Sequence, residues 1–350
     1  MTRPATLLIR ADASVTIGTG HVMRCLALGQ AWQDAGGRVV FAMAEVTDAV
    51  RLRISSEGME SVAIEAKAAS ADDARHTREL AQRSGADWVA LDGYHFGAGY
   101  RDELRSAGQN LLFLDDEGIE DRCSADIILN QNSDAVEEKY PCREPHAKLL
   151  LGTRYALLRR EFLAWRARKK EISGSASRLL VTMGGSDPDN LTGAVIEALR
   201  SITADGPQAM VLAGGSNPHF ESLRDAVSNS ADAVRLVANA SNMPELMAQA
   251  DLAIIAGGGT LWELLYMSCP VMSFSRNSVQ SRILKDLHDR GVVHHLGDPR
   301  EIAPGILAQA ISELAGSSER RAAMAEAGRR QVDGEGARRV CDVMMKWNRN

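Results

Sequence analysis

Short apolar segments alternate with longer amphipathic segments along the first half of the chain. The apolar segments are short and bounded by polar residues or glycine, which predicts strands at 7–10, 38–42, 88–91, 111–114, 127–129 and 149–151. Between them, apolar residues recur with the spacing of one helix face, which predicts helices at 21–35, 48–57, 71–84, 99–107 and 134–139. Strands that are apolar throughout and separated by helices are typical of a parallel, doubly wound sheet.

The pattern changes between the two halves. Residues 155–170 read as one helix that becomes strongly basic towards its end. The small, polar residues at 173–177 follow and predict a flexible connection, where we place the domain boundary.

The alternation then resumes. Strands are predicted at 179–183, 209–213, 234–237, 252–256, 271–274 and 292–295, and helices at 188–201, 218–228, 243–250, 260–268 and 278–290. The tail, 300–347, reads as two or three further helices. We therefore expect an α/β protein of two Rossmann-like domains, at 1–160 and 178–330, with a linker at 161–177 and a final helix at 331–350. Ligands of such sheets bind at the carboxyl ends of the strands, which for paired domains predicts a central cleft.

Composition narrows the classes of protein. The chain has 350 residues, 45% hydrophobic and 25% charged, which is typical of globular proteins and long enough for two domains. A net charge of −6 argues against a protein that binds nucleic acid through a broad basic patch. No apolar segment is long enough to span a bilayer and no signal peptide is evident, so we expect a cytoplasmic protein without stable membrane insertion. Its five cysteines form no CxxC pair, which favours reduced thiols.

The first candidate site is the glycine turn Gly18-Thr19-Gly20, which follows the first strand and leads into His21. It is not a complete dinucleotide fingerprint, because Met23 stands where the third glycine is needed. A helix N-terminus disfavours a charged imidazole, so His21 is predicted to be neutral, the form that a general base requires. The alternative is a histidine that only caps the helix.

A second glycine turn, Gly184-Gly185-Ser186, ends the first strand of the second half. Asp187 and Pro188 follow, and proline suits the first turn of a helix. The turn is either a cradle for phosphate or ribose, or an ordinary connection between a strand and a helix.

The third stretch is the most specific. Gly257, Gly258 and Gly259 follow a buried strand, and a helix begins at once with Thr260. Backbone N–H groups in such a turn can approach a diphosphate closely, and Glu263 one turn later can accept hydrogen bonds from ribose hydroxyls. A capping pair of Thr260 and Glu263 is the alternative explanation. Gln280 begins the next helix and either contacts phosphate or sugar, or lies on a solvated face.

Further polar residues follow the strands of the first half. They are Asp12, Asp92 with Tyr94, Asp115 with Asp116, and Asn130 with Asn132, while Arg10 and Arg24 could add positive charge nearby. Each is also compatible with an ordinary turn residue or a surface ion pair. No histidine or cysteine spacing typical of a metal site is present.

Seven segments together resemble a known family: IRADASVTIGTGHVMRCLAL, LDGYHFG, FLDDEG, ADIILNQN, GTRYALLRREF, VTMGGSDPDNLT and AGGGTLWELL. They run from Ile9 to about Leu265 and cover most of the chain. The third loop resembles the UDP-sugar site of the transferase that adds N-acetylglucosamine in peptidoglycan synthesis. The full set resembles the UDP-2,4-diacetamido-2,4,6-trideoxy-β-L-altropyranose hydrolases of pseudaminic acid biosynthesis, which serves flagellin glycosylation.

This resemblance implies a glycosyltransferase-B fold in which the final helix crosses back onto the first domain. It implies that water attacks the anomeric carbon with inversion, that UDP leaves, that His21 is the catalytic base, and that neither metal nor another cofactor takes part. The expected sugar-side residues are Arg10, Asp12, Gly18, Gly20, Arg24, Asp92, Tyr94 and Asn130. The expected UDP-side residues are Gly184, Gly185, Ser186, Gly258, Gly259, Thr260, Glu263 and Gln280. A UDP-sugar-dependent glycosyltransferase and a non-catalytic nucleotide-sugar binding module remain alternatives.

Overall fold

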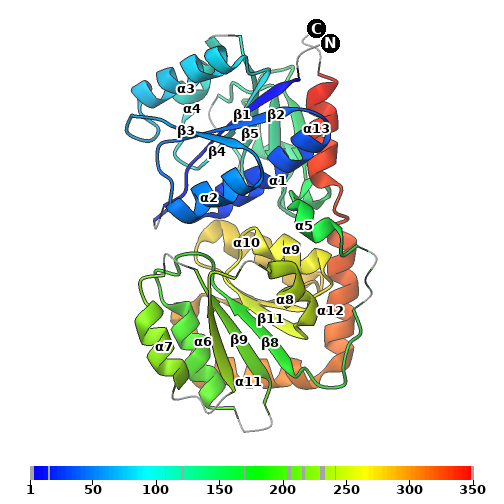
Figure 1. Cartoon of the computed structure of the whole chain (residues 1–350). Helices are drawn as coiled ribbons and strands as arrows, with labels where there is room; N and C mark the ends of the chain where they lie inside the picture. Colours follow the sequence, from blue (N-terminus) through cyan, green and yellow to red (C-terminus); the bar gives the residue numbers. More distant parts are fainter. Residues whose placement is uncertain are drawn as a thin grey trace. The chain divides into compact units, whose positions relative to one another are not determined.

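The chain forms two compact units, Met1–Arg160 with Gly334–Asn350, and Glu161–Asp333. Figure 1 shows this computed structural model, which describes residues 4–14, 16–106, 108–119, 122–166, 168, 170–202, 206–214, 217–228, 233–240 and 242–347. Among these residues no helix is both long and apolar enough to cross a bilayer.

The first unit is built on a parallel sheet of seven strands in the order β3-β2-β1-β4-β5-β6-β7. The strands are β1 (Thr6–Ala11), β2 (Arg38–Met43), β3 (Glu60–Ala63), β4 (Trp88–Asp92), β5 (Asn110–Leu114), β6 (Ile127–Asn130) and β7 (Lys148–Leu151). The helices are α1 (Gly20–Asp34), α2 (Asp48–Ser56), α3 (Ala71–Ser84), α4 (Ala98–Ser106) and, from the end of the chain, α13 (Gly336–Met345).

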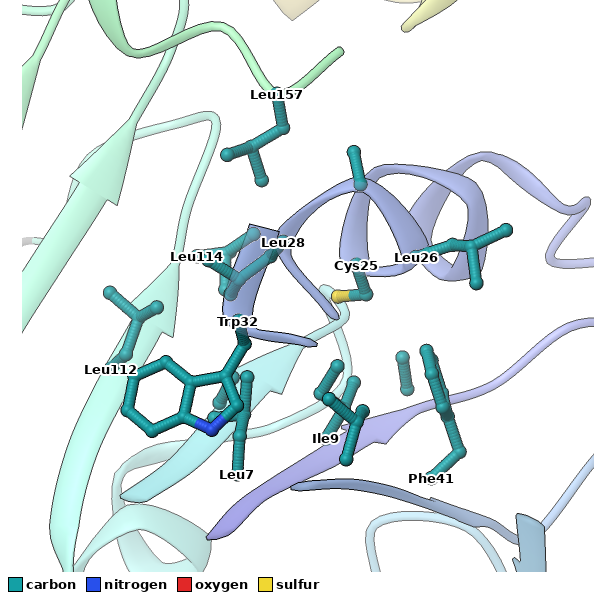
Figure 2. Packing of buried hydrophobic residues seen from close by; sticks show 14 of the residues in the cluster. Leu7, Ile9, Cys25, Leu26, Leu28, Trp32, Phe41, Leu112, Leu114 and Leu157 are labelled. Carbon is teal, nitrogen blue, oxygen red and sulfur yellow. The ribbon is translucent and has the colours of Figure 1, made fainter. Parts of the chain in front are cut away.

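Apolar side chains cover both faces of this sheet. On one face α1, α2 and α13 bury a cluster that includes Leu7, Ile9 and Trp32, which Figure 2 shows from close by. The opposite face is covered by α3 and α4. Because every strand except the two at the edges is covered on both sides, the strands read as continuous apolar segments in the sequence.

The second unit repeats this architecture with six parallel strands in the order β10-β9-β8-β11-β12-β13. They are β8 (Arg178–Thr182), β9 (Gln208–Ala213), β10 (Val234–Ala238), β11 (Leu252–Ile255), β12 (Val271–Phe274) and β13 (His294–Gly297). The helices are α6 (Leu191–Arg200), α7 (Phe220–Ser228), α8 (Met243–Gln249), α9 (Thr260–Tyr266), α10 (Ser278–Asp289), α11 (Pro304–Gly316) and α12 (Ser318–Gln331). The two sheets confirm the predicted α/β class with two Rossmann-like halves.

Each sheet has one point where the strand order reverses. In the first unit this switch lies between β1 and β4, and in the second between β8 and β11. Neighbouring strands there continue into loops that diverge to opposite faces, which leaves a crevice at their carboxyl ends. The chain segments that follow β1, β4, β8 and β11 are therefore the places to look for a site.

Two elements of the first unit differ from the predictions. β3 was not predicted, because it is a short edge strand whose residues are only partly buried and lack an apolar run. The helix predicted at 134–139 is a single 3₁₀ turn, Glu137–Lys139.

The prediction of a long basic helix at 155–170 was also wrong. Among the described residues of this stretch, Arg160–Leu163 forms the α-helix α5, and Tyr155 ends the 3₁₀ turn Thr153–Tyr155. One reason is a tertiary contact: in a helix from 155 the N–H of Arg160 would donate to the carbonyl oxygen four residues earlier, but here it donates to Oε1 of Gln30 at 2.7 Å.

The segment 173–177, where a flexible connection was predicted, is held by hydrogen bonds. The buried side chain of Arg321 donates to the carbonyl oxygens of Ser173 and Gly174 at 2.9 and 3.0 Å. This ties the segment to α12, and it belongs to the second unit.

Candidate active site

His21 lies in the first turn of α1, directly after the first glycine turn. Gly18 has a φ of +79°, a left-handed conformation that favours glycine. The side chain of His21 reaches across to the neighbouring strand, where its Nδ1 lies 2.7 Å from Oδ1 of Asp92, the last residue of β4. His21 is therefore held by a carboxylate at the switch point of the first sheet.

Arg24, one turn further along α1, connects this carboxylate to a second one. Its Nε and Nη2 each donate to Asp92 at 2.7 Å, on different oxygens. Its Nη1 donates to both oxygens of Asp116, at 2.8 and 2.9 Å. One guanidinium thus joins the end of β4 to the loop after β5.

The charges in this cluster stabilise one another. Burial alone would raise the pKa of Asp92, but the charge of Arg24, the imidazole of His21 and their hydrogen bonds lower it well below its usual range. Burial also opposes ionisation of Asp116, and again Arg24 lowers its pKa. The two carboxylates in turn raise the pKa of Arg24 despite its burial. Both acids and the arginine are therefore charged at neutral pH.

An ionised Asp92 determines what His21 can do. A carboxylate only accepts hydrogen bonds, so the proton between the two residues lies on Nδ1 of His21. The other nitrogen, Nε2, then carries a lone pair. This is the arrangement in which an imidazole accepts a proton while a carboxylate stabilises the resulting positive charge.

Tyr94 completes the cluster. Its hydroxyl donates to Oδ2 of Asp116 at 3.0 Å, and its ring meets the imidazole of His21 edge-on with 4.9 Å between centroids. Burial and the charge of Asp116 raise the pKa of this phenol, so it stays protonated. Asn132 donates from Nδ2 to Oδ1 of the same carboxylate at 2.9 Å. Asp116 thus binds a tyrosine, an amide and an arginine at once.

A cavity of about 290 Å³ opens beside these groups, entirely within the first unit. His21, Arg24 and Asp92 line its polar side, and Phe96 and Phe113 are among the apolar residues that line it. It has room for part of a small polar ligand next to the imidazole.

Arg10 and Asp12 belong to a second, fully buried network. The guanidinium of Arg10 donates to Asp12 at 2.6 Å and to Asp73 at 2.7 and 3.0 Å. Oδ2 of Asp12 lies 3.3 Å from Nε2 of His95. Arg10 has no exposed surface, so within its unit it supports the sheet end rather than a ligand.

Asn130 is buried too. Its Nδ2 donates to the hydroxyl of Tyr140 at 2.8 Å, and that hydroxyl donates to Asp115. Its Oδ1 accepts the N–H of Asn132 at 3.0 Å. Asn130 therefore orients the loop that carries Asn132, and it is Asn132 and Asp116 that reach the cluster. Both were noted in the sequence only as strand-end polar residues, since the contact with Arg24 spans 92 positions of sequence.

In the second unit, the turn Gly184–Ser186 follows β8. Gly184 has a φ of +90°, and a Cβ on the facing Gly214 would lie 2.2 Å from the carbonyl oxygen of Gly185. The prediction that Pro188 opens a helix was wrong, because α6 begins only at Leu191. Asp187 instead accepts hydrogen bonds from the N–H groups of Leu191 and Thr192, both at 2.9 Å, and so caps the helix.

The third glycine turn follows β11, the neighbour of β8. Gly257 and Gly258 have φ values of +61° and +79°, which only glycine adopts readily. Thr260 is the first helical residue, so Gly259 and not Thr260 occupies the N-cap position of α9. The side chain of Gln280 packs on the turn: a Cβ on Gly257 would lie 3.1 Å from its Cδ. The structure thus brings together both turns and Gln280 at the switch point of the second sheet.

Among the described residues, no group of three or more histidine, cysteine, aspartate or glutamate side chains is arranged to hold a metal ion.

Comparison with known proteins places these features in context. Residues 178–339 match the family profile of the glycosyltransferase family 28 C-terminal domain, a range that contains every predicted UDP-side residue. Among curated proteins, the chain is 27% identical to the uncharacterized protein MJ1062 of Methanocaldococcus jannaschii over 84% of its length. It is 28% identical to the spore coat polysaccharide biosynthesis protein SpsG of Bacillus subtilis over 57%. These matches span 60% and 58% of the two relatives.

A third relative is the UDP-2,4-diacetamido-2,4,6-trideoxy-β-L-altropyranose hydrolase of Campylobacter jejuni, which is 25% identical over 75% of this chain and 88% of its own. Among solved structures, MurG of Acinetobacter baumannii matches 98% of this chain and 100% of its own with a TM-score of 0.69 and 15% identity. HepE of Anabaena, solved with UDP-glucose, matches 98% of this chain and 100% of its own with a TM-score of 0.63 and 13% identity. The chain therefore has the glycosyltransferase-B fold and is related to proteins that handle nucleotide sugars.

Proposed function

We propose that this protein is a hydrolase of UDP-2,4-diacetamido-2,4,6-trideoxy-β-L-altropyranose that releases UDP and 2,4-diacetamido-2,4,6-trideoxy-L-altrose with inversion at the anomeric carbon. The observation that carries the proposal is the hydrogen bond of 2.7 Å between His21 and Asp92, which leaves Nε2 as a base beside a cavity. The relative of Campylobacter jejuni, whose name states this activity, supports the choice of substrate.

The proposed reaction needs one proton transfer at the protein. Water forms its bond to the anomeric carbon while the bond from that carbon to the diphosphate oxygen breaks, and the bonding electrons leave with UDP. Nε2 of His21 accepts the proton of the attacking water, and the charge of Asp92 stabilises the imidazolium. General base catalysis of this kind contributes typically about 10²–10⁴-fold to the rate.

We assign UDP to the second unit. The turns Gly184–Ser186 and Gly258–Thr260 follow the neighbouring strands β8 and β11, so their backbone N–H groups could bind a diphosphate together. Glu263 would accept hydrogen bonds from the ribose hydroxyls, and Gln280 would contact the phosphate or the sugar. The match of residues 178–339 to a glycosyltransferase domain supports this assignment.

We assign the sugar to the first unit, where Tyr94 and Asp92 flank the base. Tyr94 is 65% exposed as a residue and presents its ring beside the imidazole. Asp12 would act through His95, and the glycines at 18 and 20 would let the loop before His21 approach the sugar closely. Arg10 and Asn130 would hold this surface in place.

A UDP-sugar-dependent glycosyltransferase is the second candidate. It is favoured by the glycosyltransferase profile and by the solved structures of the same fold. The two functions differ in what UDP release requires: a hydrolase releases UDP in buffer, whereas a transferase needs an organic acceptor.

The decisive experiment follows UDP release from a panel of UDP-sugars, with and without a chelator and with and without added acceptors. The proposal predicts release without acceptor, insensitive to the chelator, with the inverted anomer of the free sugar appearing first in the NMR spectrum. Release that depends on an acceptor would establish the transferase instead.

A His21→Ala variant tests the non-catalytic alternative. It is expected to lose turnover while UDP still binds, as measured by calorimetry. Full activity in this variant would refute the role assigned to His21.

A further inference from the structure

Most of the N–H donors of Arg24 are used within the protein, whereas an arginine that binds a ligand keeps donors free for it. Four of its hydrogen bonds, at 2.7 to 2.9 Å, go to two carboxylates, Asp92 and Asp116. Its side chain is only 11% exposed. With its donors directed at protein oxygens, Arg24 has little capacity left to bind a sugar directly.

Both oxygens of Asp92 are engaged. Oδ1 accepts hydrogen bonds from Arg24 and faces Nδ1 of His21, while Oδ2 accepts from Arg24 and from the thiol of Cys25 at 3.3 Å. If the guanidinium were absent, Asp92 and Asp116 would be two buried carboxylates with no cation between them. One of two such groups takes up a proton. Asp116 would keep its donors Tyr94 and Asn132, so the proton goes to Asp92.

The protonation of Asp92 decides which nitrogen of His21 carries hydrogen. A protonated Asp92 donates to Nδ1, and the imidazole then places its own proton on Nε2. Nε2 would face the cavity as a donor and could no longer accept a proton from water. The base would be lost without any change at His21 itself.

The second carboxylate extends this effect to Tyr94. Asp116 accepts hydrogen bonds from both Arg24 and the hydroxyl of Tyr94, whose ring lies against His21. The contacts therefore form a closed ring that runs through the guanidinium of Arg24 and includes His21, Asp92, Asp116 and Tyr94.

We infer that Arg24 is a positioning residue that fixes the tautomer of His21, by bridging Asp92 and Asp116, and that it does not bind the substrate. The inference deepens the proposed function, and only its kinetic readout rests on that function. Lysine cannot replace the bridge, because an ammonium is a point charge without the planar fork that spans two carboxylates.

The test compares the full-length wild type with Arg24→Gln and Arg24→Lys, and with Arg38→Gln as a control. Arg38 makes one exposed ion pair, with Glu60, so the control makes the same chemical change away from the cluster. In protein labelled with ¹⁵N-histidine, the shifts of Nδ1 and Nε2 report the tautomer of His21. They are recorded over a pH series from about 6 to 9, so that the series includes the pH at which Asp92 of the variant still holds its proton. A His21→Gln spectrum assigns the signals.

We expect Arg24→Gln to move His21 to the tautomer protonated at Nε2 and to lower kcat by about 10²–10⁴-fold, the range for a lost general base. The affinity for UDP, measured by calorimetry, should change by less than about twofold, or about 0.4 kcal/mol, because UDP is assigned to the second unit. Arg24→Lys should lie between Arg24→Gln and the wild type in both readouts, and Arg38→Gln should match the wild type.

An unchanged His21 tautomer in Arg24→Gln overturns the inference, even if activity falls. Where Arg24→Gln fails to fold, Arg24→Lys decides: a wild-type tautomer together with a wild-type kcat overturns the inference. The two claims can fail separately. If no UDP-sugar is hydrolysed, the tautomer still tests Arg24, and if only the tautomer prediction fails, the proposed role of His21 stands.

Discussion

The role of Asp92 depends on its being ionised inside the protein. It is fully buried and yet ionised, because Arg24 donates to both of its oxygens. A buried carboxylate without such partners would take up a proton. The same carboxylate that needs Arg24 for its charge gives His21 its tautomer, so the three residues act as a unit and single substitutions will not be additive.

Asp92→Asn tests this unit. An asparagine keeps the shape but can turn its NH₂ towards Nδ1 of His21, which places the histidine proton on Nε2. We expect kcat for UDP release to fall by about 10²–10⁴-fold, the range for a lost general base, with binding of UDP nearly unchanged. Asp72→Asn, at an exposed position on α3, is the control. Wild-type turnover in Asp92→Asn would contradict the role of the carboxylate.

The depressed pKa of Asp116 predicts a pH dependence of stability. In the unfolded chain this carboxyl has its ordinary pKa of 3.8, and in the folded protein the pKa is lower because of Arg24. Its contribution to stability is therefore complete above about pH 5, and it is lost as the pH falls through 3.8 towards the folded value. We expect the free energy of unfolding, from urea titrations between about pH 6 and 3, to fall less steeply in Asp116→Asn than in the wild type. Parallel curves would show that Asp116 is not held by its ion pair.

At the residue scale, the sequence identified His21, Asp92 and Arg24 as candidates but not their contacts. A histidine after a glycine turn and a carboxylate after a buried strand are local signals. The approach of Arg24 to Asp116 depends on the pairing of β4 with β5, which places the two strand ends side by side. No local pattern carries that information.

At the element scale, apolar segments predicted most strands because nearly all of them are buried on both faces. The failures come from particular hydrogen bonds, one tertiary and one local, that the periodicity of the sequence does not show. Residues 155–170 have a helical pattern, but Gln30 binds the backbone N–H of Arg160, and among the described residues only Arg160–Leu163 forms an α-helix. Pro188 was assigned to the first turn of a helix, but Asp187 caps α6 at a later point.

The cap of α6 gives a prediction at this scale. Asp187 is buried and accepts the N–H groups of Leu191 and Thr192, so Asp187→Ala would leave both without their partner. We expect a loss of about 1–2 kcal/mol of unfolding free energy, the upper range for a lost cap. Amide hydrogen exchange at the start of α6 should rise. Asp189→Ala, in the same turn but exposed, should be neutral, and an equal effect of both variants would argue against a specific cap.

At the scale of the whole molecule, two similar sheets each place their candidate residues at one switch point. The base and its partners follow β1 and β4, and the glycine turns follow β8 and β11. This division was predictable, because alternating apolar strands and helices restart after a break in the pattern. Which half carries the nucleotide was inferred from glycine turns and family resemblance, and the cleft expected between the halves stays a prediction.

The end of the chain belongs to the first unit, and this has a measurable consequence. α13 packs against α1 (Figure 1). The carbonyl oxygen of Met344 accepts the indole N–H of Trp88 at 3.1 Å. Met344 is buried among the residues that support the helix of His21, so Met344→Ala should cost about 2–5 kcal/mol of unfolding free energy. The neighbouring Met345 is 42% exposed, and Met345→Ala should cost little.

Hydrogen exchange locates the effect of Met344→Ala. Because the side chain belongs to the apolar cluster of the first unit, exchange should rise in α1 and β1 and stay unchanged in the sheet of the second unit. UDP affinity should be retained at temperatures where the variant is folded, since UDP is assigned to the second unit. Equal destabilisation by Met344→Ala and Met345→Ala, or increased exchange confined to the second unit, would show that the chain end does not stabilise the helix that carries the base.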